Sequence, residues 1–353
     1  MAYTTINKPT DYFSSNLYTG TGSALTVTTG HQSDFIWIKQ RTTVRPHCLF
    51  DSVNSSNFAG GNSKYLVSNT TAALTSNNAT QITANSSTGF SIGTDNSDQI
   101  NNNGDTAVAW SWKANGAGSS NTDGSITSTV SANTTSGFSI AQWTGTGSNA
   151  TIGHGLGVTP KCFIVKKTSG TSAWSVYHES VGNTKFLNLN GTGAATTSST
   201  VWNNTSPTSS VFSVGTADNG NASGATYIGY FFADVQGYSK MGSYVANGNV
   251  NGPFVYTGFK PAFVMIKGDA DEAWRIVDSK RLGYNVDNRY LTPNDATVES
   301  GSVSDIDLLS NGFKLRSAAG NYNSGSLYNY IYMAFAETPF VANSGESIPT
   351  TAR

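Results

Sequence analysis

Three short apolar stretches of the chain each end in a lysine. Residues 35–39 read FIWIK, residues 162–166 read CFIVK and residues 263–267 read FVMIK. Successive side chains of a β-strand point to opposite faces, so a stretch that is apolar at consecutive positions is covered on both faces. Each stretch is therefore predicted to be a central strand of a sheet, and its recurrence indicates an internal repeat.

The same landmarks follow each stretch in the same order. An apolar residue of a second strand comes 11, 11 and 10 positions after the lysine, and a basic–aromatic–leucine triplet, a phenylalanine and an alternating apolar run come after it. The landmark residues are Phe50, Tyr177 and Val277, then Leu66, Leu187 and Leu291, then Phe90, Phe212 and Phe313, and finally Val108, Ile228 and Ile331. Five landmarks that recur three times in one order predict three units of similar structure.

The composition between the apolar runs is typical of a strand-rich protein with many turns. The 353 residues include 37 Gly and only 12% charged residues. Small and β-branched polar residues suit half-buried strands, and Gly and Asn suit the positive φ angles of hairpins. With no convincing amphipathic helix in the sequence, we predict an all-β protein of three tandem antiparallel β-sandwich or jelly-roll-like repeats.

The repeat sets the expected boundaries. Unit one spans residues 14–115, unit two 137–236 and unit three 237–342, followed by a C-terminal tail at 343–353. Residues 116–136 are rich in small residues, which indicates either a flexible linker or an added edge strand. Whether the three units are separate domains or one body stays open.

The loops before the last strand of each unit are rich in Asn, Gly and Asp. They cover residues 94–105, 216–224 and 317–326. Such segments are typical hairpin loops, so we expect them to project into solvent and to tolerate substitution.

Charge and cysteine content narrow the possible partners. The net charge is −1, from 20 basic and 21 acidic residues, and no basic run could follow a phosphate backbone, so no nucleic-acid partner is expected. The N-terminus has no signal-peptide pattern and no apolar window is long enough for a span, so we expect cytoplasmic synthesis without a signal peptide and no membrane insertion. Cys48 and Cys162 occupy different repeat positions, which favours two buried free thiols over a disulfide.

Histidines offer little for catalysis. None of the four is paired at a metal-ligand spacing. They are His31, His47, His154 and His178. No cofactor and no catalytic residue is expected, although carboxylates that meet only in the fold would leave glycoside hydrolysis open.

The densest acidic group lies in one loop of unit three. Asp269, Asp271 and Glu272 are weak candidates for a metal site, because the loop occurs in one repeat only and a solvated hairpin tip explains it as well. Asp51 and Asp278 occupy equivalent positions after the second strand of their units. That position favours a structural turn hydrogen bond over a general base.

Two aromatic residues outside the repeated columns are candidates for glycan binding. Trp202 lies among polar loop residues and Tyr322 lies in a Gly–Asn–Tyr–Asn loop. A sugar ring stacks well on such side chains. The alternative is that each ring packs beneath its own loop or in a subunit contact.

Whole phrases of the chain resemble an uncharacterised repeat domain of marine bacteriophage virion structural proteins. These phrases include FIWIKQRT, HCLFDSV, KYLVSNTTAAL, VAWSWKANG, ATIGHGLGVTPKCFIVKK and GYSKMGSYVANGNVNGPFVYTGFKPAFVMIK, and they cover most of the chain. The resemblance implies a tail-fibre-like virion component with a lectin-like β-sandwich fold. It brings no catalytic residues.

Composition and resemblance together favour a non-enzymatic structural protein at the virion surface, a tail or tail-fibre component that contributes to attachment to host-surface glycan. A head decoration or cement protein that stabilises the capsid, or a carbohydrate-active enzyme, remains an alternative. Expected partners are other virion proteins, further copies of the chain in a homo-oligomer, with a trimer expected for a fibre, and host surface glycan.

Overall fold

The fold of the protein is dominated by antiparallel β-strands. The computed structural model describes residues 4–339, apart from 62, 77–79, 282–288, 302–304 and 326–327. Within these residues the helices are at most six residues long, and they are η1 (Pro9–Asp11), η2 (Ser56–Gly61), α1 (Asp218–Asn221) and α2 (Gly320–Asn323). The prediction of an all-β protein is confirmed.

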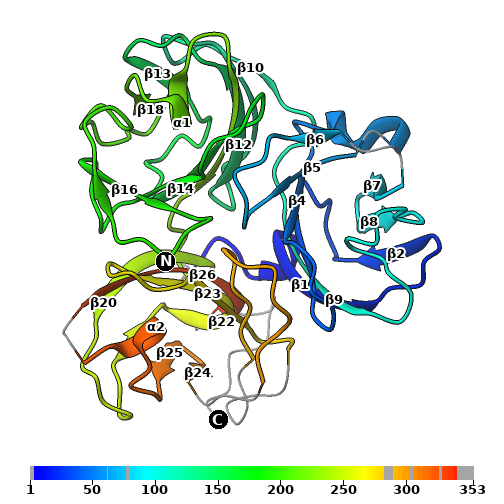
Figure 1. Ribbon diagram of the computed structural model, residues 1–353, viewed down its shortest axis with the longest axis vertical. Coiled ribbons are helices and arrows are strands. Elements are labelled where there is room, and N and C mark those ends of the chain that lie inside the picture. The colour runs from blue at the N-terminus through cyan, green and yellow to red at the C-terminus, as the bar shows by residue number, and fades with distance from the viewer. Residues whose placement is uncertain are drawn as a thin grey trace.

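Three lobes surround a common centre, and each lobe is one successive segment of the chain (Figure 1). The strands of the first lobe are β1 (Phe13–Thr19), β2 (Leu25–Thr28), β3 (Phe35–Gln40), β4 (Cys48–Asp51), β5 (Lys64–Val67), β6 (Thr75–Ser76), β7 (Ile82–Ser86), β8 (Gly89–Ile92) and β9 (Thr106–Trp112). They form a large sheet in the order β1-β9-β3-β4-β5-β6 and a small sheet in the order β2-β8-β7.

The second lobe has the largest sheet. Its strands are β10 (Ser119–Asn121), β11 (Ser128–Asn133), β12 (Phe138–Thr144), β13 (Ala150–Gly153), β14 (Cys162–Lys167), β15 (Ser175–His178), β16 (Lys185–Asn188), β17 (Thr196–Thr197), β18 (Val211–Val214) and β19 (Thr226–Phe232). The large sheet has the order β10-β11-β12-β19-β14-β15-β16-β17, and β13 and β18 form the small one. Residues 116–136, the linker or edge strand of the sequence, thus supply β10 and β11.

The third lobe repeats the order with fewer strands among the described residues. Its strands are β20 (Ser239–Val245), β21 (Phe254–Tyr256), β22 (Phe259–Gly268), β23 (Arg275–Asp278), β24 (Ile306–Leu309), β25 (Gly312–Leu315) and β26 (Asn329–Pro339). The large sheet has the order β20-β26-β22-β23 and the small one β21-β25-β24. The predicted tail at 343–353 lies outside the described residues.

The landmark residues meet in the same register in all three large sheets. The lysines that end the apolar stretches, Lys39, Lys166 and Lys267, stand opposite Val108, Ile228 and Ile331 respectively. In the small sheets Phe90, Phe212 and Phe313 stand opposite Val27, Ile152 and Val255. The recurring sequence pattern therefore corresponds to recurring strand pairing.

Each large sheet is covered on both faces. All six residues of β3 are buried, as the run of apolar residues predicts. Ile36 and Ile38 pack in the core of their own lobe, and Phe35 and Trp37 pack in a second core that all three lobes share. This alternation follows from the period of two along a strand.

The shared core is aromatic, and rings from different lobes touch in it. Phe35 stacks on Tyr230 with ring centroids 4.3 Å apart, Trp112 meets Phe263 at 5.7 Å, and Phe232 meets Phe335 at 5.8 Å. Each of the three lobe–lobe junctions has one of these contacts. The three units are therefore one body with one central core and not three separate domains.

Buried polar groups also join the lobes in a cyclic pattern. Equivalent positions of β4, β15 and β23 hold Asp51, His178 and Asp278. The Tyr230 hydroxyl donates to Asp51 at 2.9 Å, the Trp110 indole N–H donates to Asp278 at 3.0 Å, and His178 Nε2 lies 3.2 Å from the Tyr332 carbonyl oxygen. Both aspartates also accept turn hydrogen bonds from backbone N–H groups. The structural role predicted for the two aspartates is confirmed.

A second set of polar contacts crosses the same three junctions. The Trp174 indole N–H donates to the Val67 carbonyl of unit one at 3.0 Å, and the Trp274 indole N–H donates to the Asn188 carbonyl of unit two at 2.9 Å. Between units three and one, the buried carboxylate of Glu299 accepts from the Arg41 guanidinium at 2.8 Å. Every junction thus combines apolar burial with satisfied polar groups.

Because the core is shared, we expect the chain to unfold in one cooperative transition that a central cavity shifts as a whole. Phe335→Ala should cost about 3–5 kcal/mol, since it leaves a cavity beneath rings of other lobes. Phe254→Ala, the same change at a side chain that is 46% exposed, should cost under about 1 kcal/mol. Denaturant titrations followed by tryptophan fluorescence and by circular dichroism would measure both values. Separate transitions for individual lobes in the parent chain would contradict the shared core.

Candidate functional site

The two aromatic residues predicted to bind glycan are buried. Trp202 is 1% exposed, its indole N–H donates to the Lys185 carbonyl at 3.1 Å, and its ring meets Phe163 edge-on at 4.9 Å. Tyr322, in α2, is also 1% exposed and packs in the core of the third lobe. Neither ring offers a face to a sugar in this structure, and its burial agrees with the alternative that each ring packs beneath its own loop. Tyr322 occupies the repeat position of buried Ile100, a signal that the sequence did contain.

The acidic loop of unit three makes hydrogen bonds both within its own lobe and to the second lobe. Asp271 accepts a hydrogen bond from the Ala194 N–H of unit two at 2.8 Å, and Glu272 accepts one from the Tyr330 hydroxyl at 2.8 Å. The Asp269 carboxylate lies 3.5 Å from the side-chain amide nitrogen of Asn329 in β26. Across the described residues, no group of three His, Cys, Asp or Glu side chains is placed to hold a metal ion. The expected solvated hairpin tip is thus in contact with a neighbouring lobe.

The lysines that end the apolar stretches are fully buried. Lys39, Lys166 and Lys267 are each 0% exposed. Each ammonium donates to the backbone carbonyl of the next residue, at 2.6, 2.6 and 2.7 Å. Burial lowers the pKa of each lysine to about 8, because the charged form loses its hydration. These lysines hold strand ends, where no ligand can reach them.

Each Asn-rich loop contains one buried asparagine. Asn101, Asn221 and Asn323 are all 0% exposed. The Asn221 amide nitrogen donates to the carbonyls of Ser148 and Gly215 at 2.5 and 2.8 Å, and its oxygen accepts from the Thr146 N–H at 2.9 Å. Asn101 and Asn323 make the corresponding three bonds. The expectation that these loops project into solvent is therefore wrong at this position, because the amide binds each loop to the turn after the first strand of its unit.

The histidines and cysteines are closed to solvent as well. His31 lies between the Thr10 carbonyl and the Ser111 hydroxyl, at 2.9 and 3.1 Å, and burial lowers its pKa to about 4. Cys48 and Cys162 are free and buried, as expected, and burial raises the pKa of both thiols. These groups stabilise the fold as neutral species.

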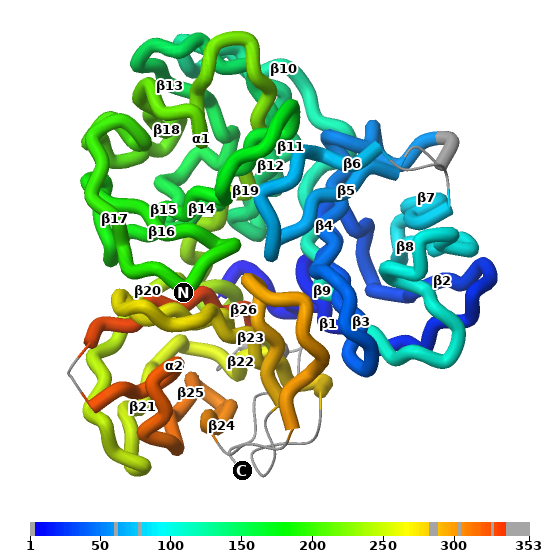
Figure 2. The backbone as a smooth tube through the Cα atoms, viewed as in Figure 1, coloured from blue at the N-terminus to red at the C-terminus, as the bar shows by residue number. Residues whose placement is uncertain are grey.

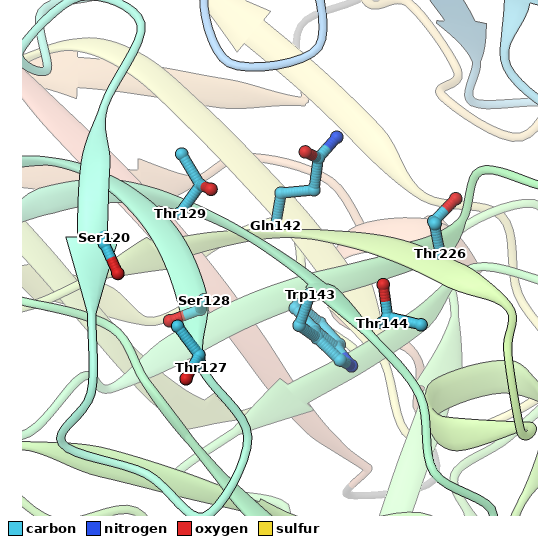
Figure 3. Close-up of a pocket in the computed structure, with 8 residues that line it drawn as sticks. All are labelled: Ser120, Thr127, Ser128, Thr129, Gln142, Trp143, Thr144 and Thr226. Carbon is cyan, nitrogen blue, oxygen red and sulfur yellow. The ribbon is translucent and has the colours of Figure 1, made fainter.

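An accessible polar groove lies on the second lobe, where four strands run side by side. We call it the hydroxyl groove; its volume is about 220 Å³. It is lined by Ser120 of β10, Thr127, Ser128 and Thr129 at β11, Gln142, Trp143 and Thr144 of β12, and Thr226 of β19 (Figure 3). In Figure 2 the backbone of β11 and β12 runs at the side of this lobe that faces the first lobe, and Gln142 donates to the Asn54 side chain of unit one at 2.9 Å.

No lining residue of the hydroxyl groove is ionisable. Ser120, Thr127 and Thr144 are exposed, and Gln142 is partly exposed. Trp143 is 2% exposed and its indole N–H donates to a loop carbonyl at 3.2 Å, so it is not a stacking platform. Figure 3 shows it projecting away from the side on which Gln142 projects. The groove can therefore form hydrogen bonds in both senses but offers no charge.

The groove exists because unit two departs from the repeat. β10 and β11 extend its sheet, whereas the corresponding edges in the other lobes are β1 and β20. The Gln142 position is held by Leu17 in unit one and Ser243 in unit three. The sequence did not reveal the site, because most of its residues are Ser and Thr, which are common throughout the chain. The one feature that pointed to it was the alternating extra segment between units one and two.

A second hollow, of about 330 Å³, lies where the second and third lobes join. Asp234 and Lys240 line it together with Tyr256. It carries both signs of charge within a lobe junction, unlike the hydroxyl groove.

A family model described as Domain of unknown function (DUF7483) matches residues 8–339. The match covers most of the chain, which therefore belongs to this family. No curated protein matches the chain. Among the described residues, none of the helices has the length and apolar character needed to cross a bilayer.

The buried amides should matter more to stability than their loop neighbours. Asn221→Ala should lower the free energy of unfolding by about 2–4 kcal/mol, since three hydrogen bonds are lost and their buried backbone partners stay unpaired. Asn219→Ala, two residues away, removes one bond to Ser175 and should cost about 1 kcal/mol or less. Chemical denaturation of both variants measures the difference. Equal losses would show that the amide does not lock the loop.

The buried lysines should make stability rise with pH. The pKa of Lys166 is about 8 in the folded chain, against 10.5 when unperturbed. Between these values the unfolded chain binds more protons, so the free energy of unfolding rises with pH over this window, by up to about 3 kcal/mol for one lysine. Lys166→Met should remove that increment. Unfolding titrations at several pH values compare the two chains, and parallel pH profiles would contradict the shift.

Proposed function

We propose that the protein is a non-enzymatic structural component of a phage virion, exposed on the particle as a tail or tail-fibre part that contributes to attachment to host-surface glycan. The observation that carries this proposal is the single aromatic core, which fuses three lobes into one rigid body. The resemblance to marine phage virion proteins supports the virion setting.

The distribution of ionisable groups supports a role without catalysis. General acid–base and nucleophilic chemistry require such groups within reach of a substrate. In the described part of the chain the histidines, the repeated lysines and the paired aspartates are buried in contacts that hold strands and lobes together. Neither large hollow brings two carboxylates together, as glycoside hydrolysis would require.

We further propose that the three units are tandem antiparallel sandwiches of the jelly-roll-like kind. The support is the same strand order and the same register in each large sheet, with a smaller sheet packed over it. Contacts such as that of Phe163 with Phe212, at 5.2 Å, connect the two layers of one lobe.

A homo-oligomer, with a trimer for a fibre, is also proposed. The central core is complete within one chain, so further copies would associate through outer surfaces. Six of the nine exposed large apolar side chains among the described residues belong to unit three. These six are Val245, Val250, Phe254, Tyr256, Val298 and Tyr328. This makes the third lobe the proposed contact with other copies or other virion proteins.

A head decoration protein is the second candidate, and the arrangement of the lobes favours it. Three similar lobes around one centre can offer three similar contacts to a capsid surface with a threefold axis, and such contacts add. Localisation of the protein on the particle separates the two candidates.

For the attachment role, purified protein should compete with phage for the host surface. Pre-incubating host cells with the folded chain should reduce adsorption of the phage that encodes it, while heat-unfolded chain should not. The effect should persist from low to moderate salt, because a nearly uncharged protein binds without much screening. Antibody labelling of intact particles should mark the tail. Labelling of the head together with undiminished adsorption would replace this proposal with the decoration role.

A further inference from the structure

The hydroxyl groove presents its side chains in rows across neighbouring strands. Ser120 stands opposite Thr129, and Thr129 stands opposite Gln142, so three polar side chains form one row over β10, β11 and β12. Thr144 stands opposite Thr226 in a second row. Strands in a sheet lie about 4.8 Å apart, so a ring-sized ligand can touch side chains from several strands at once.

The chemistry of these rows matches that of a polyhydroxylated molecule. A Ser or Thr hydroxyl donates one hydrogen bond and accepts two, and the Gln amide offers both senses. Sugar hydroxyls have the same dual character. A carboxylate or sulfate placed in the groove would lose hydration without meeting a cation, because no lining residue is charged.

From these observations we infer that the hydroxyl groove is a binding site for one ring of a neutral saccharide, and that it discriminates against acidic and sulfated glycans. This inference rests on the proposed attachment role and names the surface that performs it. The volume of about 220 Å³ is smaller than that of pockets that enclose a drug-sized ligand, roughly 300–1,000 Å³, so the ends of a longer chain remain in solvent.

Binding at one groove should be weak. No exposed aromatic ring lines it, so the large apolar contribution of stacking is absent. We expect a dissociation constant in the millimolar range, which many copies on one particle would convert into useful avidity.

Saturation-transfer NMR on the full chain tests the inference. The probes are neutral oligosaccharides of glucose, galactose, mannose and N-acetylglucosamine at millimolar concentration, each beside a sulfated or carboxylated analogue. We expect transfer to at least one neutral probe and less to its charged analogue. Stronger transfer to the charged analogues, or none to any neutral probe, would overturn the inference.

The internal repeat supplies a matched control variant. Thr144→Val should weaken binding of the neutral probe by roughly 2- to 10-fold, the effect of one neutral hydrogen bond. Thr19 is exposed at the equivalent position of β1, opposite Thr106 as Thr144 is opposite Thr226, so Thr19→Val should leave binding unchanged. Gln142→Leu, which introduces the residue that unit one has there, is a second groove variant. Equal effects of Thr144→Val and Thr19→Val would place the binding elsewhere.

The adsorption assay distinguishes a failure of the groove assignment from a failure of the attachment role. If the folded chain blocks phage adsorption but Thr144→Val and Gln142→Leu block it equally well, the groove assignment is wrong and the attachment role stands. If no form of the chain blocks adsorption or binds a neutral probe, both are wrong. Reduced blocking by the two groove variants alone supports both.

Discussion

The aromatic core shared by three sheets is the constraint on which the rest of the molecule depends. Each large sheet has a second apolar face that its own small sheet cannot cover, because that small sheet already lies on the other side. Phe35, Trp112, Phe232 and Phe335 lie on these second faces, and burying them against one another removes a large apolar area from water. No lobe could expose its inner face without the others, so folding of each lobe is tied to assembly of all three.

Closing the shared core also buries polar side chains. Similar hydrogen bonds at successive lobe junctions pair these buried groups. Asp278 accepts a hydrogen bond from the Trp110 indole N–H across one junction, and Asp51 accepts one from the Tyr230 hydroxyl across another. An unpaired carboxylate at such a depth would cost several kcal/mol, whereas a paired one also fixes the angle between lobes. The ionisable residues that were considered as catalytic candidates in the sequence therefore have structural roles. Ligand recognition is left to residues at the surface.

Strand pairing was predictable from the sequence because it follows from periodicity, whereas side-chain placement in loops was not. The spacing from Lys39 to Phe50 recurs from Lys166 to Tyr177, and both pairs stand in the same register. Trp202 lies in a polar loop yet is buried, because a loop can fold back over a ring and composition does not record that path. The groove escaped prediction for a related reason. Its members come from four strands whose adjacency is set only when β10 and β11 join the sheet.

The added strands β10 and β11 depart from the strand order that the three units share, and the hydroxyl groove lies where they join the sheet. Equivalent positions in the three lobes are tied to each other through one core, so a change there disturbs all of them. The added edge strands β10 and β11 contribute no residue to the shared core, and they create concave surface beside β12. Thr144 is exposed in the groove while its neighbour Trp143 is buried and bonded beneath it. Substitution at the surface can therefore change what the groove accepts while the frame below stays fixed.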